Sequence, residues 1–456
     1  MVVAPKSWLT DLFRSNGGDH SVLGILSFEA ARSMSRLVSL HRSLSDSDFS
    51  ALRDRTVHSA GVAFLNSSDP SHLLTLACAE NLSALDSAAD VVSRLSHRCR
   101  SRDLRGFSAV YSDLKTGAVD LGRVAFLPRV LDRKVRRMEE LASMTSALYG
   151  RMEDLAEMEA AERRNGQWKS FSGPIKAAAP QSPPESEDFR RKIEKQRQIV
   201  RKLKEASLWG KTVDKAVKLM ACAICSIFAR ICVLFGPYDP DLPLTLTDRT
   251  GNIRLFRIHH HQLIYASGPL ERPAAAANLI IRNSGPILRT APKKSQPILT
   301  PAASTVGGAA LAVRYAEVIV AAESLLHCGA ADDEAREELY AMLPAGLRGA
   351  VKGKLRRCWR EGESGPSDDE SMAEGWREAV GRLMEWLGPV AHDTLAWQAE
   401  RSLERQNREE TGRRRVMMMQ TLYFSDREKV EAAIAEVLVG LSCVRWYESR
   451  REEEKM

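Results

Sequence analysis

The chain has 456 residues, of which 44% are apolar and 6% aromatic, and its formal net charge is +7 at pH 7. This length favours two or three domains, and this composition is typical of aliphatic, alanine-rich helical bundles. The small net charge excludes a chain that is basic throughout. Eight cysteines scattered through apolar stretches indicate a reducing compartment rather than a disulfide framework.

The sequence before the first predicted helix carries no targeting signal that we recognise. It begins MVVAPKSWLTDLF, with no cationic stretch followed by a long apolar run, so we expect a chain that is not secreted. Val2 stands where N-myristoylation requires glycine, so we expect no myristoyl anchor. We therefore expect an intracellular protein, nuclear or cytoplasmic, with peripheral attachment to the plasma membrane as the alternative.

We assign residues 1–165 to an N-terminal helical domain. Apolar residues recur at helical spacing from Leu26 to Leu37, and Ser45 is in place to cap a second helix. Asp69 followed by Pro70 predicts the start of a third helix, because proline suits the first helical position.

Residues 128–164 show the heptad pattern of a coiled coil, in which apolar residues alternate steps of three and four. The pattern is compatible with antiparallel pairing inside a bundle or with oligomerisation through 128–164. The apolar positions are Leu131, Val135, Met138, Ala142, Thr145, Leu148, Met152 and Leu155.

Residues 166–186, rich in Pro, Ser, Gly and Ala, predict a linker, and residues 187–236 predict one long helix, basic first and apolar later. The apolar run from Leu219 to Phe235 is short for a membrane span and contains Arg230, so we expect a buried core helix. Cys222 and Cys225 lie inside this run, where cysteine acts as a small hydrophobe rather than as a metal or redox group.

The basic half of this helix is the candidate docking surface. Residues 189–205 contain eight bases and two acids, a local charge of +6, and apolar residues mark one packed face. The other face has the chemistry to meet acidic proteins, phosphoinositide headgroups or nucleic acid, although a solvated helix face is the simpler interpretation. The eight bases are Arg190, Arg191, Lys192, Lys195, Arg197, Arg201, Lys202 and Lys204.

We assign 237–304 to a second, mobile, proline-rich linker with a strand-like run at 253–258, and 305–450 to a C-terminal helical domain. Helices are expected at 306–328, 332–343, 345–360, 371–405 and 416–448. Ser425 and Glu428 have the spacing of a capping box at the start of the last amphipathic stretch. Its apolar face comprises Val430, Ile434, Val437, Leu438, Leu441 and Val444.

We predict no catalytic, cofactor-binding or metal site, and therefore no enzyme. The consecutive His259, His260 and His261 lack a partner cluster, and Gly307-Gly308 is followed by no phosphate-loop motif. We expect these glycines to permit close helix–helix contact. His392-Asp393 has no nucleophile with an identifiable motif, and packing is the simpler interpretation.

Three blocks resemble the plant PSK simulator family, whose members carry two plant-specific domains of unknown function. They are ILSFEAARSMSRLVSLHRSL with LLTLACAENL, then residues 200–236, then 305–448 with TVGGAALAVRYAEVIV, ELYAMLPAGLR and WLGPVAHDTLAWQAERS. The resemblance implies no enzymatic activity and a role in growth promotion and phytosulfokine signalling, at the nucleus or the plasma membrane. Several members share a myristoylation site, from which this chain departs at Val2.

The sequence thus predicts an all-α protein with helical bundles joined by long, mobile, proline-rich linkers. The function that we expect is non-enzymatic regulation of plant growth through protein–protein contacts in phytosulfokine-type hormone signalling. The alternative is a peripheral membrane or trafficking scaffold held on anionic lipid by the basic helix. We expect protein partners, no small-molecule substrate and no nucleic acid.

Overall fold

A computed structural model of the chain describes residues 22–118, 128–171, 184–240, 242–247, 253–256, 299–328, 333–362, 369–401 and 415–455. The all-α prediction is confirmed, with a single small sheet among the described residues. The helices are α2 (Leu26–Ser43), α3 (Asp46–Ala51), α4 (Ala60–Leu65), α5 (Pro70–Ser96), α6 (Arg102–Arg105), α7 (Phe107–Lys115), α8 (Pro128–Phe171), α9 (Pro184–Ala206), α10 (Val213–Phe235), α11 (Ala312–Cys328), α12 (Asp333–Met342), α13 (Ala345–Gly362), α14 (Asp369–Arg401) and α15 (Arg427–Lys455).

Helix α10 is the centre of the first core. Its apolar residues pack with those of α2, α5, α7 and the first half of α8. By length and composition α10 is apolar enough to cross a membrane, but most of its residues are buried inside the protein. The prediction of a buried core helix is confirmed. Phe228 and Phe235 are fully buried and make edge-on ring contacts with Tyr111 and Phe49.

The expectation of one continuous helix over 187–236 is wrong, because residues 207–212 separate α9 from α10. The Ser207 hydroxyl accepts a hydrogen bond from the Trp209 N–H, and the Thr212 hydroxyl caps α10 by accepting from the Lys215 N–H. The hydroxyl of Thr145, on α8, accepts from the Leu208 N–H at 3.1 Å. These side chains satisfy backbone groups that a continuous helix would have paired internally.

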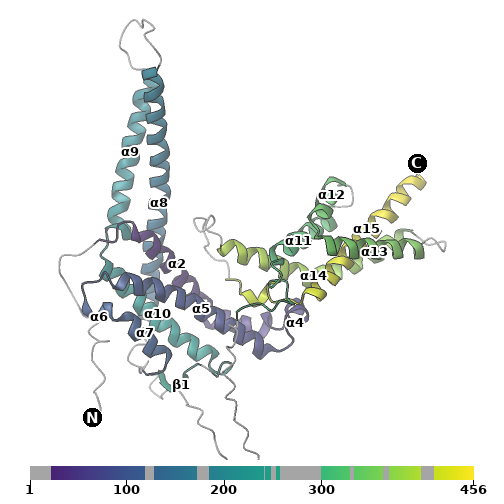
Figure 1. Ribbon diagram of the computed structural model, residues 1–456, viewed down its shortest axis with the longest axis horizontal. Helices are drawn as coiled ribbons and strands as arrows, with labels where there is room; N and C mark the ends of the chain where they lie inside the picture. The colour runs from purple at the N-terminus through teal and green to yellow at the C-terminus, as the bar shows by residue number, and fades with distance from the viewer. Residues whose placement is uncertain are drawn as a thin grey trace, which may run out of the picture.

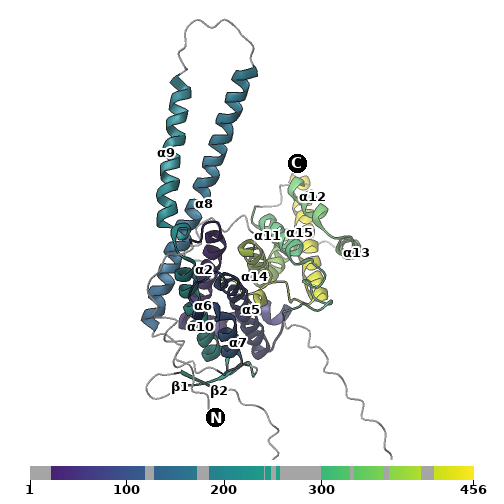
Figure 2. The same cartoon turned by 60° about the vertical axis from the view of Figure 1, so that its left-hand side comes forward.

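Helices α8 and α9 form a long antiparallel hairpin that projects away from the rest of the protein (Figures 1 and 2). Leu131, Val135, Met138 and Leu148 of the predicted heptad face are buried within the chain, which matches the intrachain interpretation of the pattern. Helix α8 continues to Phe171 and α9 begins at Pro184, so the predicted linker is helical at both its ends. Its middle, 172–183, lies outside the described residues.

Strands β1 (Leu244–Thr247) and β2 (Ile253–Phe256) pair in antiparallel register, with Leu244 opposite Phe256. The second strand falls within the strand-like run that the sequence predicts. Most of the predicted linker at 237–304, including His259, His260 and His261, lies outside the described residues.

Helices α11, α13, α14 and α15 build the second core. The predicted face of α15 packs there: Val430, Ile434, Val437, Leu438 and Val444 are buried, and Leu441 is partly buried. Helix α11 begins at Ala312 rather than at 306, because residues 305–311 form turns in which Gly307 and Gly308 approach backbone carbonyls closely. The close contact expected from these glycines is therefore with turn and extended backbone, not with a second helix.

The predicted capping box at Ser425 is wrong, since α15 begins at Arg427 and Asp426 is its cap. The Asp426 carboxylate accepts from the Lys429 N–H at 3.0 Å. The Ser425 hydroxyl instead donates to the side-chain oxygen of Asn66 at 2.5 Å. Asn66, which is distant in the sequence, thus binds the hydroxyl that the local pattern predicted to cap the helix.

The two cores are joined by α4, α5 and the segment 415–426, which contains a short 3-10 helix at Met418–Gln420. The Asn66 amide, just after α4, donates to the carbonyls of Met419 (2.6 Å) and Thr421 (3.2 Å). Glu80 of α5 is buried and accepts from the Met418 N–H (2.6 Å) and the Trp397 indole (3.2 Å). These hydrogen bonds connect the first core to α14 and to the start of α15.

Replacing Gly61 with alanine will destabilise the protein by about 2–3 kcal/mol, because overpacking a close contact forces the backbone to shift. A Cβ on Gly61 of α4 would lie 2.3 Å from the Trp386 carbonyl oxygen and 2.7 Å from Val390 of α14. In α13, Gly349 has no atom within 4 Å of the corresponding position. Gly349→Ala is the matched control and should stabilise by about 0.5–1 kcal/mol. Urea unfolding of both variants checks the prediction, which fails if the two shifts have the same sign.

Candidate functional site

Helix α9 carries all eight bases of the candidate docking surface on the projecting hairpin (Figure 2). Its packed face is the predicted one, with Ile193 and Val200 buried and Ile199 and Leu203 partly buried. The Gln196 amide adds a donated hydrogen bond to a carbonyl of α8 at 3.2 Å. Of the eight bases, Lys204 is partly buried and the other seven are exposed.

One row of bases lies along the edge of α9 that is next to α8. Arg190, Arg197 and Lys204 are seven residues apart and so share one edge of α9. Arg197 forms an ion pair with Glu159 of α8 at 3.0 Å, and Arg190 lies 3.4 Å from Glu162. Side-chain hydrogen bonding to Glu159 raises the pKa of Arg197 further.

Lys204 belongs to an aromatic cluster at the foot of the hairpin. Its ammonium lies over the Trp209 ring, 4.7 Å from the centroid, in a cation–π contact. The Phe28 ring of α2 meets Trp209 at 5.8 Å and Tyr149 of α8 at 5.4 Å between centroids, both edge-on. This cluster attaches the hairpin to the first core, so Lys204 contributes to hairpin structure.

A second row points away from α8. We call Arg191, Lys195 and Lys202 the exposed row, because their spacing of four and seven residues aligns them along one strip of the helix. Among the residues that the structure describes, Arg191 pairs only with acids of its own helix, Glu187 at 3.8 Å and Asp188 at 3.5 Å. Such exposed pairs contribute about 0–1 kcal/mol and break readily when a stronger partner arrives.

Lys192 and Arg201 lie beside the exposed row and extend its basic surface. Lys195 and Lys202 make no ion pair with any residue that the structure describes, and the same holds for Lys192 and Arg201 beside them. The exposed row spans roughly 16 Å at 1.5 Å per helical residue. It therefore offers three aligned cations over about two Debye lengths at physiological ionic strength.

A second basic helix, α13, was not singled out by the sequence analysis. Residues 348–360 carry six bases and no acid. Leu347, Val351 and Leu355 are buried against α15, and Trp359 is 43% exposed. Four bases make no ion pair within the described residues, namely Lys352, Arg356, Arg357 and Arg360. A count of charge in short windows would have found α13 as readily as α9.

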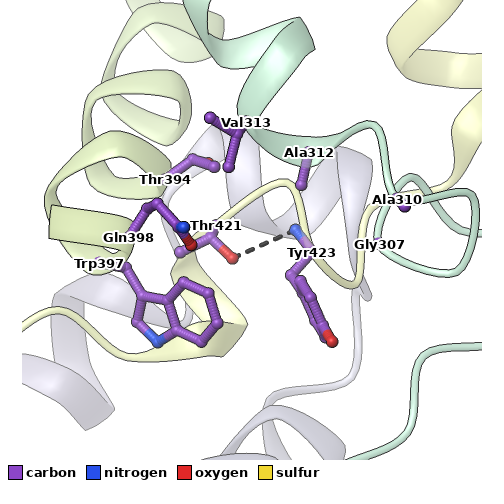
Figure 3. A pocket seen from close by; sticks show the side chains of 9 residues that line it. All are labelled: Gly307, Ala310, Ala312, Val313, Thr394, Trp397, Gln398, Thr421 and Tyr423. Carbon is purple, nitrogen blue, oxygen red and sulfur yellow. Dashed lines mark hydrogen bonds between the residues drawn. The ribbon is translucent and has the colours of Figure 1, made fainter. Parts of the chain in front are cut away.

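A small cavity of about 110 Å³ lies where α11 and α14 meet the segment 415–426 (Figure 3). Tyr423 is the one titratable side chain among the described residues that line it, and the Thr421 hydroxyl accepts from the Tyr423 N–H at 3.1 Å. Ligand pockets are usually roughly 300–1,000 Å³. Among the described residues the lining contains no carboxylate, imidazole, amine or thiol: Gly307, Ala310, Ala312, Val313, Thr394, Trp397, Gln398, Thr421 and Tyr423. The cavity therefore gives no support to an enzymatic interpretation.

No hydrogen bond joins His392 to Asp393 among the described residues. The His392 ring lies 2.5 Å from a carboxylate oxygen of Glu323 on α11. Burial raises the pKa of Asp393 to about 6, although the charge of His392 and a hydrogen bond from Gln420 oppose the shift. No group of three metal-binding side chains occurs in the part of the chain that the structure describes.

Asp393→Asn will stabilise the protein at pH 7.5 by about 1–2 kcal/mol and by much less at pH 4.5. Burial raises the folded-state pKa of Asp393 above its ordinary value of 3.8, so the folded protein holds this proton more tightly than the unfolded chain does. The contribution of protonated Asp393 to the free energy of unfolding of the wild type is therefore lost as the pH rises towards about 6. Urea unfolding at both pH values checks this, and an equal difference at the two would contradict it.

Comparison with known proteins shows what the chain is related to. The profile of a domain of unknown function (DUF3475) matches residues 25–81, and that of a protein of unknown function (DUF668) matches residues 305–396. Protein PSK SIMULATOR 1 of Arabidopsis thaliana is 22% identical over 428 residues, which cover 92% of this chain. PSK SIMULATOR 3 and PSK SIMULATOR 2 of the same plant are 24% and 20% identical over 95% and 96% of this chain.

Over more than 90% of its length the chain is similar to the PSK simulator proteins. It spans 55%, 59% and 61% of the lengths of PSK SIMULATOR 1, 3 and 2. No solved structure matches it significantly. The basic helix α9 lies outside the two matched domains, whereas α13 lies within the second. One of the two basic surfaces thus lies within a matched domain and the other lies outside both.

Proposed function

We propose that this chain is a non-enzymatic regulator of plant growth that acts in phytosulfokine-type hormone signalling, in the nucleus or the cytoplasm. The names of its three relatives support the connection with this hormone. Both matched domains are described only as being of unknown function, and the cavity at the junction has no catalytic arrangement. Regulation through protein–protein contacts therefore suits the chain better than catalysis.

The exposed row of α9 is the surface proposed for these contacts. The observation that carries the proposal is its place on a projecting hairpin, where Lys195 and Lys202 lack ion-pair partners among the described residues (Figure 1). Because these cations stand on an already formed helix, docking of an acidic partner restricts the lysine side chains but does not have to order the backbone. A partner carrying an acidic strip roughly 16 Å long would be complementary to this row.

A peripheral membrane or trafficking scaffold on anionic lipid is the second candidate, and α13 favours it. Its bases lie beside the exposed Trp359, and bases with an interfacial aromatic ring suit a bilayer surface. Flotation with phosphatidylserine-containing vesicles separates the two candidates. Salt-sensitive flotation that is lost on reversing Lys352, Arg356 and Arg360 would support the scaffold.

The proposed function is tested in seedlings that express this chain under an inducible promoter. We expect induction to change the root-growth response to added phytosulfokine, and the same chain with the exposed row reversed to leave the response unchanged. Immunoblotting shows that the two proteins accumulate equally. An identical hormone response with and without the wild-type chain would contradict the proposal.

A further inference from the structure

Two cysteines from different helices of the second core face each other. Cys358 lies on α13 and Cys443 on α15, and their sulfur atoms are 3.2 Å apart. Both are free thiols. A disulfide bond is about 2.05 Å long, so roughly 1 Å of sulfur movement separates this pair from a bond.

The surrounding contacts hold the two sulfurs in place. Helix α13 packs against α15 through Leu347, Val351 and Leu355, the three residues that precede Cys358 on the same face. The Lys354 ammonium and the Glu436 carboxylate form an ion pair at 2.5 Å between the same two helices. The two sulfurs therefore already lie next to each other on two helices that pack together.

The other cysteines whose side chains the structure describes differ from Cys358 in access. Cys78, Cys99, Cys222, Cys225 and Cys232 are at least 95% buried, whereas Cys358 is partly exposed. Cys222 and Cys225, the lone CxxC, lie one turn apart inside α10, and burial raises their pKa values to about 11 and 12. Burial raises the pKa of Cys443 to about 12 as well, so it is exposure that sets Cys358 apart. An oxidant in solution thus reaches Cys358, and Cys443 is the sulfur that lies next to it.

We propose that Cys358 and Cys443 form a reversible disulfide when a hydroperoxide oxidises the protein. The Cys358 sulfur attacks one peroxide oxygen of hydrogen peroxide, becomes a sulfenic acid, and one water leaves. The Cys443 sulfur then attacks the Cys358 sulfur, and the sulfenic hydroxyl leaves with the Cys443 proton as a second water. Two thiols are oxidised and one peroxide is reduced to two waters. A dithiol reductant reverses the step by exchange.

The bond would fix α13, with its exposed bases, to the middle of α15. It closes a loop of more than 80 residues, and closure of a long loop stabilises chiefly by restricting the unfolded chain. In a reducing compartment such a bond is transient, as expected for a redox-responsive rather than a structural disulfide. The matched domain of unknown function supplies Cys358, and Cys443 lies beyond it.

The test uses the reduced full-length chain, treated with graded hydrogen peroxide and then alkylated without reduction. We expect an intact mass lower by two hydrogens, and a tryptic cross-link between residues 358–360 and 430–445 that dithiothreitol removes. Oxidation should raise Tm by roughly 3–8 °C. Cys222 and Cys225 are the internal control and should be alkylated in full after denaturation.

Cys358→Ser is the matched variant, because the site is partly exposed and serine fits it. Its Tm under reducing conditions should equal that of the wild type, and peroxide should change neither its mass by two hydrogens nor its Tm. Three results overturn the proposal: a sulfinic acid at Cys358 with Cys443 still alkylated, a covalent dimer through Cys358, or no oxidation at peroxide concentrations that oxidise free cysteine.

Discussion

Reversal of Arg191, Lys195 and Lys202 to glutamate lowers association of the chain with its acidic partner by roughly 10- to 100-fold, at an unchanged Tm. Each exposed charge at an interface contributes about 1 kcal/mol, and reversal adds repulsion to the lost attraction. The fold is preserved because the exposed row is separate from the ion pairs of Arg190 and Arg197 with α8.

Quantitative mass spectrometry of proteins cross-linked to the tagged chain in plant cells measures this effect. The matched control reverses Lys352, Arg356 and Arg360 on α13, which changes the net charge equally on another surface. We expect the control to keep the partners that the exposed-row variant loses. Equal loss in both variants would mean that total charge, rather than the row, determines association.

Glu80→Ala destabilises the protein by about 3–5 kcal/mol, the second large effect. Glu80 is 3% exposed, and its two oxygens accept from the Met418 N–H and the Trp397 indole. Its charge also opposes the lowering of the Arg415 pKa by burial. Alanine would leave two buried donors without their acceptor and would remove one of the two carboxylates whose charge stabilises the buried Arg415 guanidinium.

Urea unfolding followed by circular dichroism measures this loss. Glu80→Gln keeps one acceptor oxygen and should cost less than alanine. Glu153→Ala, on an exposed position of α8, is the surface control and should stay within about 0.5 kcal/mol of the wild type. An alanine variant at position 80 with wild-type stability would show that the junction does not depend on this carboxylate.

Sequence periodicity predicted the parts of the fold that depend on local burial. The caps at Ser45 and Asp69, the core helix α10 and the buried face of α15 are where the patterns put them. These features succeed because the residues that decide them are neighbours along one helix.

The errors arise where a distant residue decides the local structure. Asn66 takes the hydroxyl of Ser425, and Thr145 satisfies the Leu208 N–H at the break between α9 and α10. The same holds for the candidate surface. All eight bases of α9 are visible in the sequence, but the ion pairs of Arg190 and Arg197 with acids of α8 become visible only in the fold. These ion pairs distinguish the two arginines from the exposed row.

The most direct test of the exposed row as a docking surface is the location of three fluorescently tagged full-length chains in plant cells. These are the wild type, the exposed-row variant and the α13 control. We predict that the wild type and the α13 control share one distribution, and that the exposed-row variant loses it and becomes diffuse. Indistinguishable distributions of all three would contradict the account, and a change in the α13 control alone would favour attachment to anionic lipid.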